Sequence, residues 1–303
     1  MKYEIKSYQE EFLDDQVRIG TAVLSQWRFA GQTPKEQLKQ TYSQQEFTPE
    51  TRLYAFHEGK MAGFVTSYVL EEEGVKKARI EIPIVTKGHE EARNALFEEA
   101  TKVLKEKGVK ILRTRAGEYW TGTTQLAEAF GFKYTSVLAR ESRKRINEIK
   151  ISIDPVDVNS YDPKKEFNQL VKLVMKQFNV PEETAKPVAE RYNDWKIGEA
   201  KSPFGFPQTL IFHEIIMKEG EIVGRVLGLQ AEQYGQNVVL LGALYVKDND
   251  EKIRGQLIAA AVRETKKMGL KELLVQIGAE GEESYTPYGF EFSTKLGFYE
   301  KEI

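Results

Sequence analysis

Apolar and polar residues along this chain follow two periods, the alternation typical of strands and the spacing typical of helices, and they follow them in the same order twice. In the first half, an alternating N-terminal segment precedes a helical apolar pattern over residues 10–29. Three more alternating segments come next, and the Glu58-Gly59 pair marks a turn between the first two. The pattern therefore predicts strands at residues 2–8, 53–59, 59–72 and 78–85.

A long helix is predicted after the break at Lys87-Gly88. Its apolar positions recur at helical spacing, and Gly108 ends it as a C-terminal glycine commonly does. These apolar positions are Ala92, Ala95, Leu96, Ala100, Val103 and Leu104. A strand at residues 109–117, a short helix at 123–130 and a last strand at 133–142 complete the first half.

The second half repeats this order. Its first expected strand covers residues 149–156, and two helices follow, with starts marked by Asp162-Pro163 and Val180-Pro181. The remaining expected elements are strands at residues 209–217, 222–232 and 237–246, a main helix from Glu251 to Met268, a strand at residues 270–278, and a short helix ending at Gly297-Phe298.

A fixed offset relates the two halves. The segment Glu58–Val65 (EGKMAGFV) recurs as Glu219–Val226 (EGEIVGRV), so the glycines at 63 and 224 differ by 224 − 63 = 161. The same offset pairs Val85 with Val246, Arg93 with Arg254, Leu96 with Leu257, Ala100 with Ala261, Gly108 with Gly269 and Gly117 with Gly278. After a five-residue insertion, AFGF matches KLGF (297 − 131 = 166). We therefore expect a tandem duplication.

The expected junction between the copies is the charged stretch from Arg140 to Lys150. This places one domain at residues 1–147 and the other at residues 148–303. A chain of 303 residues is long enough for two such domains, each with its own core.

Composition narrows the classes of function. The formal charge is −2, from 44 basic and 46 acidic residues, so we expect neither a nucleic-acid nor an acidic-membrane partner. The absence of cysteine excludes disulfides, thiolate metal sites and cysteine nucleophiles. The charged N-terminus lacks a signal peptide, and no apolar run approaches the ~20 residues of a membrane span, so a cytoplasmic location is expected.

Other catalytic motifs are missing from the sequence. The three histidines, His57, His89 and His213, form no i, i+4 pair, so no metal site is expected. No serine lies in a Gly-x-Ser-x-Gly elbow, and there is no Walker-type phosphate loop. The oligomeric state is left open by the sequence.

The order strand, helices, three antiparallel strands, helix, strand, helix, strand resembles the GNAT superfamily of N-acetyltransferases, and it occurs twice. Two local features resemble that family: the turn from Val85 or Val246 into a long helix, and the Gly-Phe pairs at residues 131–132 and 297–298. The resemblance implies an α/β fold with a mixed sheet, built as two tandem acyl-CoA N-acyltransferase domains. The second copy lacks its last strand, and we expect the strand after Phe132 to serve both copies.

The resemblance implies transfer of an acetyl group from acetyl-CoA to an amine of a small molecule or peptide, without a metal. In the family, backbone N–H groups at the turn hold the pyrophosphate, and glycines let the backbone come close. Copy one has Glu90 and Glu91 at this turn, which repel phosphate, whereas copy two is basic. The candidate cofactor-binding residues are therefore Val246, Lys247, Lys252, Arg254, Gly255 and Gln256, although Gly255 is out of register with the family's glycines.

Glu81 is the candidate catalytic base, because the family often places a carboxylate four residues before the position of Val85. Gly242 takes the equivalent place in copy two, and Ala127 and Ser293 stand where the family has its tyrosine acid. Two alternatives stay open. Glu81 is also the polar partner expected in an alternating strand, and the whole chain is also compatible with a catalytically inactive ligand-binding or scaffold protein.

Aromatic residues gather in two parts of copy two. They are Trp195 with the loop Ser202–Pro207, and Tyr285, Tyr288, Phe290 and Phe292. They could form the wall of a cleft for an apolar acceptor, or fill the core between the copies. Glu118-Tyr119-Trp120 in copy one carries the same two interpretations.

Overall fold

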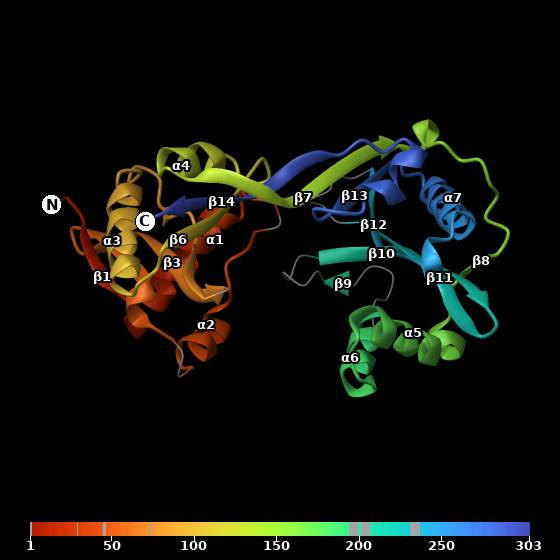
Figure 1. Cartoon of the computed structure of the whole chain (residues 1–303), viewed down its shortest axis with the longest axis horizontal. Helices are drawn as coiled ribbons and strands as arrows, with labels where there is room; N and C mark the ends of the chain where they lie inside the picture. Colours follow the sequence, from red (N-terminus) through yellow and green to blue (C-terminus); the bar gives the residue numbers. More distant parts are fainter. Residues whose placement is uncertain are drawn as a thin grey trace. The chain divides into compact units, whose positions relative to one another are not determined.

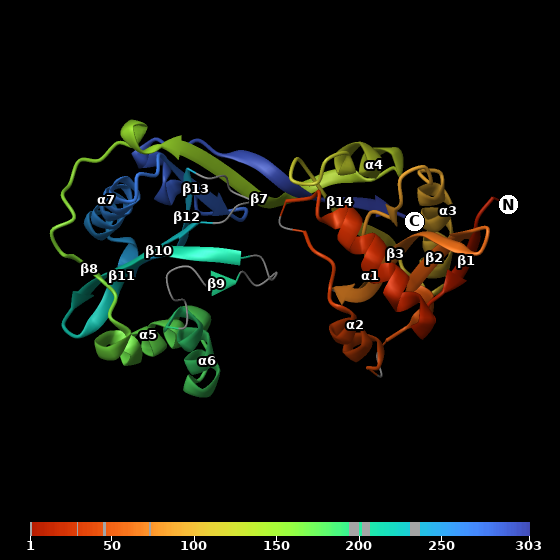
Figure 2. The ribbon, with the colours of Figure 1, turned by 180° about the vertical axis from the view of Figure 1, so that it is seen from behind.

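The computed structural model describes residues 2–28, 30–44, 47–72, 74–193, 200–201, 207–230 and 237–303. Its contacts divide the chain into two compact units. Unit 1 comprises Met1–Ala139 and Thr294–Ile303, and unit 2 comprises Arg140–Ser293. Figures 1 and 2 show the chain from opposite sides. The domain boundary at residue 147 stays a prediction about how the two copies are divided.

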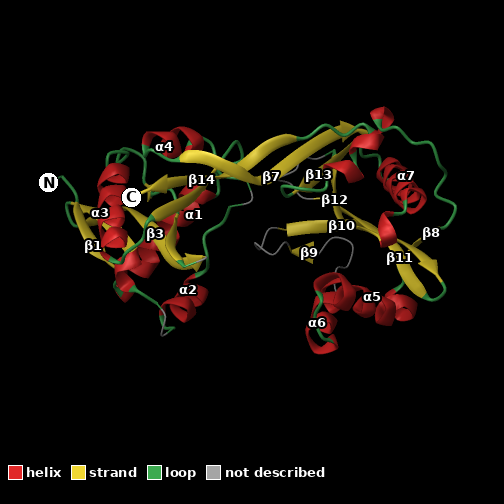
Figure 3. Cartoon of the chain, viewed as in Figure 1, coloured by secondary structure: helices red, strands yellow, loops and turns green. Residues whose placement is uncertain are grey.

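Unit 1 is a sheet with helices on both faces, and Figure 3 shows its strands in yellow between red helices. Its elements are β1 (Glu4–Ser7), α1 (Leu13–Leu24), α2 (Lys35–Tyr42), β2 (Arg52–His57), β3 (Lys60–Glu72), β4 (Val75–Ile80), β5 (Ile84–Val85), α3 (Ala92–Glu106), β6 (Ile111–Ala116), α4 (Thr123–Ala129), the first part of β7 (Lys133–Arg145) and β14 (Ser293–Glu302). The strand order is β1-β2-β3-β4-β6-β14-β7. The sequence patterns did not predict α2.

Alternation along β2 gives unit 1 two cores. Leu53 and Ala55 pack with residues of α3, including Leu96, in one buried cluster. Tyr54 lies on the opposite face and packs with Ile19 of α1. This is the expected result when successive side chains of a strand point to opposite faces of a sheet that is covered on both sides.

Unit 2 has a similar plan. Its elements are the last part of β7, β8 (Val158–Ser160), α5 (Pro163–Phe178), α6 (Glu182–Asn193), β9 (Ala200–Lys201), β10 (Pro207–Lys218), β11 (Glu221–Gln230), β12 (Val238–Val246), α7 (Glu251–Lys267) and β13 (Glu272–Ile277). The strand order is β7-β13-β12-β11-β10-β8, and β9 pairs with β10. As predicted, α5 begins at Pro163, where the side chain of Asp162 caps the helix by accepting from the backbone N–H of Lys164.

The 161-residue offset also holds for backbone conformation. Strand β6 starts at residue 111 and ends at 116, and β13 starts at 272 and ends at 277. The turn residues Glu58 and Gly59 have φ of 50° and 76°, and Glu219 and Gly220 have φ of 51° and 78°. Two equivalent segments therefore fold into the same local structure, including a strained left-handed glutamate in each turn.

Strand β7 takes part in both units. Unit 1 includes the strand as far as Ala139, and unit 2 includes it from Arg140 onward. In unit 2 its last six residues pair antiparallel with β13. The chain ends in unit 1, where β14 pairs antiparallel with β6. The prediction that the strand after Phe132 serves both copies is confirmed.

Two predicted elements of the second half are wrong. The segment ending at Gly297-Phe298 forms strand β14 and not a helix, because its backbone pairs with β6 and its Tyr299 is buried in the core of unit 1. Residues 149–156 form no strand, and pairing starts only at Val158. Pro155 lacks an N–H to donate to a neighbouring strand, which disfavours pairing of that segment.

Among the helices of the described residues, none is both long enough and apolar enough to cross a membrane.

Candidate functional site

In unit 1, two parallel strands part near Glu81. In this described part of the chain, β4 and β6 pair from Lys77–Ile111 to Arg79–Arg113, and their pairing ends there. Strand β5 pairs instead with β3. The backbone N–H of Glu81 still donates to Thr66 at 3.0 Å. Glu81 therefore lies just beyond the point where β4 leaves its parallel neighbour β6, while its backbone is still hydrogen-bonded to β3.

Two arginines hold the carboxylate of Glu81. Its Oε1 accepts from Arg79 Nε at 2.8 Å and Nη2 at 2.6 Å, and from Arg115 Nη2 at 2.9 Å. The Glu81 side chain is 26% exposed. The guanidinium of Arg115 also lies over the Trp120 ring, 5.1 Å from its centroid. The structure thus adds to Glu81 a cross-strand ionic tie that the sequence did not predict.

Unit 2 parts its strands one residue pair after the place equivalent to Arg79 (79 + 161 = 240). Pairing between β12 and β13 runs from Val238–Glu272 to Leu241–Val275 within the described residues and ends there. The next residue is Gly242, and 242 − 81 = 161. Ala243 has a φ of 48°, and the register between β11 and β12 shifts beside it. The register with the neighbouring strand shifts by one residue in both units, after Ser67–Ile80 in unit 1 and after Leu227–Gly242 in unit 2. The units therefore share the bulge, and unit 2 has a glycine where unit 1 has the Glu81 carboxylate.

The start of helix α7 is closed by its own chain. The carboxylate of Asp250 accepts from the backbone N–H groups of Ile253 at 3.1 Å and Lys252 at 2.8 Å. The hydrogen bond from Ile253, helped by the one from Lys252, lowers the pKa of Asp250. These N–H groups are the ones that would favour an external anion at a helix start. A pyrophosphate at this turn therefore has to compete with Asp250.

The basic residues expected at the cofactor turn are only partly available. Val246 ends β12 opposite Gly224. Lys247 Nζ pairs with Glu221 at 2.8 Å, whereas Lys252 is exposed. Lys252 is therefore the predicted cofactor residue best placed to meet a phosphate from solvent.

Arg254 lies deeper than the sequence suggested. It is 8% exposed, and its Nη2 donates to Asn249 Oδ1 at 3.1 Å. Its Nε is buried without a hydrogen-bond partner. Arg254 therefore braces the turn before α7 and holds one unused donor.

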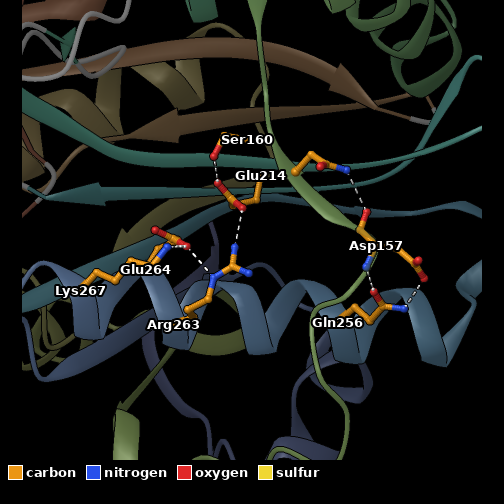
Figure 4. A network of polar contacts seen from close by, with 8 residues as sticks. Asp157, Ser160, Glu214, Gln256, Arg263, Glu264 and Lys267 are labelled. Carbon is orange, nitrogen blue, oxygen red and sulfur yellow. Dashed lines mark hydrogen bonds and ion pairs between the residues drawn. The ribbon is translucent and has the colours of Figure 1, made fainter.

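Gly255 and Gln256 contact a segment of their own unit. A Cβ on Gly255 would lie 2.9 Å from Ile153 Cγ2, so the side chain of Ile153 packs closely against this glycine. Gln256 accepts from the backbone N–H of Asp157 at 2.9 Å and donates to Asp157 Oδ2 at 2.9 Å, as Figure 4 shows. Both residues are thus explained by packing within unit 2.

The turn before helix α3 in unit 1 also contains an acid that accepts a backbone hydrogen bond. The backbone N–H of Gly88 donates to Glu90 Oε1 at 3.0 Å, and this hydrogen bond lowers the pKa of Glu90. Glu91 pairs with Lys2 at 2.6 Å. The acidic turn predicted from the sequence is present in the structure, and the Glu90 carboxylate occupies one backbone N–H of that turn, the one of Gly88.

Comparison with solved structures decides the fold. A tandem GNAT protein from the clavulanic acid biosynthesis pathway superposes with a TM-score of 0.56 at 13% identity, covering 99% of this chain and 98% of that one. A GCN5-related N-acetyltransferase from Sphaerobacter thermophilus gives 0.51 at 12%, covering 99% and 96%. One from Anabaena variabilis gives 0.50 at 10%, covering 99% and 72%. The chain has the tandem GNAT fold.

Comparison of the sequence finds no relative that would support the structural similarity. Neither protein-family models nor curated protein sequences match the chain. The GNAT fold therefore rests on structure, and at these identities it speaks for the architecture alone.

The aromatic residues near the end of unit 2 lie mostly in its core. Tyr285 is 7% exposed and Phe290 1%, and both belong to the apolar cluster around α7, with Tyr288 and Phe292 packed against it. This favours the core interpretation over an open acceptor wall for these four residues. Trp195 and residues 202–206 lie outside the described residues.

In unit 1 the corresponding loop forms a small aromatic cluster. Tyr119 and Trp120 are buried with Leu296, and Trp27 stacks on Trp120 at 5.8 Å between ring centroids. Trp120 Nε1 donates to the backbone oxygen of Arg28 at 3.0 Å. Trp120 of this cluster lies against the Arg115 guanidinium, which in turn pairs with Glu81.

His57 and His89 are neighbours in the structure, although they lie far apart in the sequence. The rings of His57 and His89 lie 5.2 Å apart between centroids, and Tyr3 contacts both. Within the described residues, no group of three or more His, Asp or Glu side chains is placed to hold a metal.

His213 is buried in unit 2. Its Nε2 accepts from Arg225 Nε at 3.0 Å, and Tyr161 lies 4.3 Å away between ring centroids. Burial, with the nearby Arg225 charge, lowers the pKa of His213 well below its ordinary value. The neighbouring Glu214 faces the other way, toward Ser160 and Arg263 (Figure 4).

Of the residues that shape these sites, Asp250 was accessible to sequence reasoning and Arg115 was not. An aspartate directly before a helical pattern is a typical N-cap. Arg115 meets Glu81 across 34 residues of sequence, and no local pattern carries that contact.

Proposed function

We propose that this chain, a tandem duplication of one GNAT unit, is an acyl-CoA-dependent N-acetyltransferase that acetylates an amine of a small molecule or peptide. The observation that carries the proposal is the parting of two parallel strands in the segment before a long helix, within one residue of equivalent positions in both units. The full-length likeness to a tandem GNAT protein and to a GCN5-related N-acetyltransferase supports it.

In this proposal Glu81 is the base. The amine nitrogen forms a bond to the thioester carbonyl carbon, the carbon–sulfur bond breaks, coenzyme A leaves as the thiolate, and the proton lost by the amine goes to Glu81. The three hydrogen bonds to the Glu81 carboxylate all reach Oε1. Oε2 is then the oxygen that takes the proton, with Arg79 and Arg115 fixing the orientation of the carboxylate.

The candidate base lies in unit 1 and the more basic helix start lies in unit 2, so the two assignments are made independently. For unit 2, the proposal assigns the phosphates of acetyl-CoA to the start of α7. Lys252 is exposed there, and Lys247 and Arg254 add positive charge on the same turn. Binding requires the pyrophosphate to displace the Asp250 carboxylate from the N–H groups of Lys252 and Ile253.

A second candidate is a non-catalytic GNAT-like ligand-binding or scaffold protein. Two observations favour it: Asp250 already caps α7, and Gln256 is engaged by Asp157. In that case the fold is retained while the anion-binding turn is filled by the chain itself.

Release of the coenzyme A thiol separates the two candidates. The chain contains no cysteine, so a thiol reagent reports coenzyme A without background from the protein. Acetyl-CoA is offered with a polyamine, an amino sugar and a lysine-containing peptide. The proposal predicts thiol release with at least one amine, and Glu81→Gln lowers kcat by about 100-fold.

Glu118→Gln is the control, because Glu118 is an exposed acid of unit 1 that pairs with Lys295. It is expected to leave kcat unchanged. Unchanged turnover in Glu81→Gln would remove Glu81 as the base. No thiol release above the rate without protein, with any of the three amines, would favour the non-catalytic candidate.

A further inference from the structure

A cavity in unit 1 lies between the end of α2, the start of β2 and the end of β3. Its volume is about 320 Å³, within the roughly 300–1,000 Å³ of small-molecule sites. It is lined by Thr41, Gln44, Phe47, Thr48, Thr51, Arg52, Ser67, Tyr68, Val69 and Leu70. None of these residues belongs to the Glu81 cluster or to either helix start.

The deep end of this cavity is polar, and the charged side chain of Arg52 lies there. Arg52 is 2% exposed, and Thr51 and Ser67 are buried beside it. Arg52 Nη1 donates to the backbone oxygen of Thr51 at 3.1 Å, to its Oγ1 at 2.9 Å, and to the backbone oxygen of Ser67. The cation is therefore fixed by neutral oxygens.

Aromatic rings surround the Arg52 guanidinium. Its central carbon lies 4.0 Å from the centroid of the Tyr68 ring, 5.4 Å from Tyr42 and 5.6 Å from Phe47. Such rings attract a cation but carry no net charge to neutralise it. Within the described residues, no carboxylate forms an ion pair or hydrogen bond with Arg52. Its Nε is also buried without a partner.

Burying a charge without a counter-ion costs free energy of folding, and the buried charge of Arg52 lines an open cavity. The rim of that cavity is apolar and open. Tyr68 is 44% exposed and Leu70 41%. Arg52 on β2 is paired with Thr66 on β3, so these two residues share a face of the sheet. Tyr68 and Leu70 follow Thr66 at two-residue steps along β3, so their side chains lie on that same face. The site therefore combines one buried positive charge with an exposed apolar wall.

We infer that this cavity binds a small monocarboxylate with an aromatic or branched apolar body. The carboxylate lies toward Arg52 and the hydroxyl groups of Thr48 and Thr51, and the apolar body lies against Tyr68 and Leu70. One cation matches one negative charge, so a monoanion suits the site better than a phosphate dianion. The inference does not depend on acyl transfer.

A matched pair of ligands tests the charge. Phenylacetate and phenylacetamide have the same apolar body, and only the first is an anion. Each is titrated into the full chain by calorimetry, without acetyl-CoA. Phenylacetate is expected to bind at least about tenfold more tightly, a difference of about 1.4 kcal/mol. Equal affinities, or no heat from phenylacetate up to about 10 mM, would overturn the inference.

Two surface variants test the place of binding and avoid any loss of folding from changing Arg52. Leu70→Trp fills the cavity and is expected to abolish phenylacetate binding. Val75→Trp is the control, since Val75 is a similarly exposed apolar residue, at 37%, outside the cavity lining. It is expected to bind phenylacetate like the unmodified chain. Retained affinity in Leu70→Trp, or equal loss in both variants, would contradict this site.

Discussion

Where the parallel strands part, unit 1 places the carboxylate of Glu81 between two arginines, whereas unit 2 has Gly242. Positions 81 and 242 are equivalent under the 161-residue offset. The backbone event is therefore the same in both units, but the chemistry at it is not. The backbone path depends on turns and apolar positions, while a side chain at an exposed strand end is free to change.

A second pair of equivalent positions shows the same divergence. Arg52 on β2 and His213 on β10 are both buried, and 213 − 52 = 161. Arg52 faces a cavity, and Tyr68 stacks on it. His213 accepts a hydrogen bond from Arg225 and lies against Tyr161. Each unit thus buries a nitrogen base beside a tyrosine, and only the one in unit 1 is permanently charged.

The largest expected difference between the units comes from the closing strand of unit 1. A Cβ on Gly117 would lie 2.1 Å from the backbone oxygen of Lys295 in β14, whereas a Cβ on the equivalent Gly278 would meet nothing within 4 Å. Gly117→Ala is expected to cost about 2–3 kcal/mol of unfolding free energy, because the backbone contact cannot relax. Gly278→Ala is expected to stay within about 0.5 kcal/mol. Urea unfolding followed by circular dichroism measures both, and equal effects would refute the difference.

A smaller effect is expected from the buried base of unit 2 when pH falls. Burial keeps the folded-state pKa of His213 below the unfolded value, so the unfolded chain binds the extra proton first. The contribution of His213 to stability is therefore present above about pH 6.5 and falls by up to about 1.4 kcal/mol per pH unit below it. His213→Gln should remove this slope between about pH 6.5 and 5.5. An unchanged slope in the variant would show that other groups cause it.

The smallest effect compares the two acids at the helix starts. Asp250 accepts from two N–H groups of α7, whereas Glu90 accepts from Gly88, before α3 begins. Asp250→Ala should therefore lower the urea midpoint more than Glu90→Ala at neutral pH. The folded-state pKa of Asp250 is lowered, so its contribution is full above an unfolded pKa of about 3.9 and disappears as pH falls through the lower folded value. Equal midpoints for the two variants at neutral pH would count against this difference.

The sequence was enough for the strands and helices that carry their own apolar period, and it failed where the decisive contact is distant. The strand at β13 and the helix at α7 carry their own apolar periods, so they were predicted within a few residues. The last ten residues carry no strong period, and only pairing with β6 makes them a strand. The Glu81–Arg115 contact and the aromatic surroundings of Arg52 join residues far apart in sequence, so they needed the fold.

Calorimetric titration with acetyl-CoA tests the central claim most directly. The account predicts a Kd below about 1 mM, and Lys252→Glu raises it by about tenfold because an exposed cation near the phosphates becomes an acid. Glu91→Gln, the change at the equivalent exposed residue of unit 1 (252 − 91 = 161), is expected to leave the Kd unchanged. No heat of binding at about 1 mM acetyl-CoA, or a response to Glu91→Gln and none to Lys252→Glu, would contradict the assignment of the cosubstrate to unit 2.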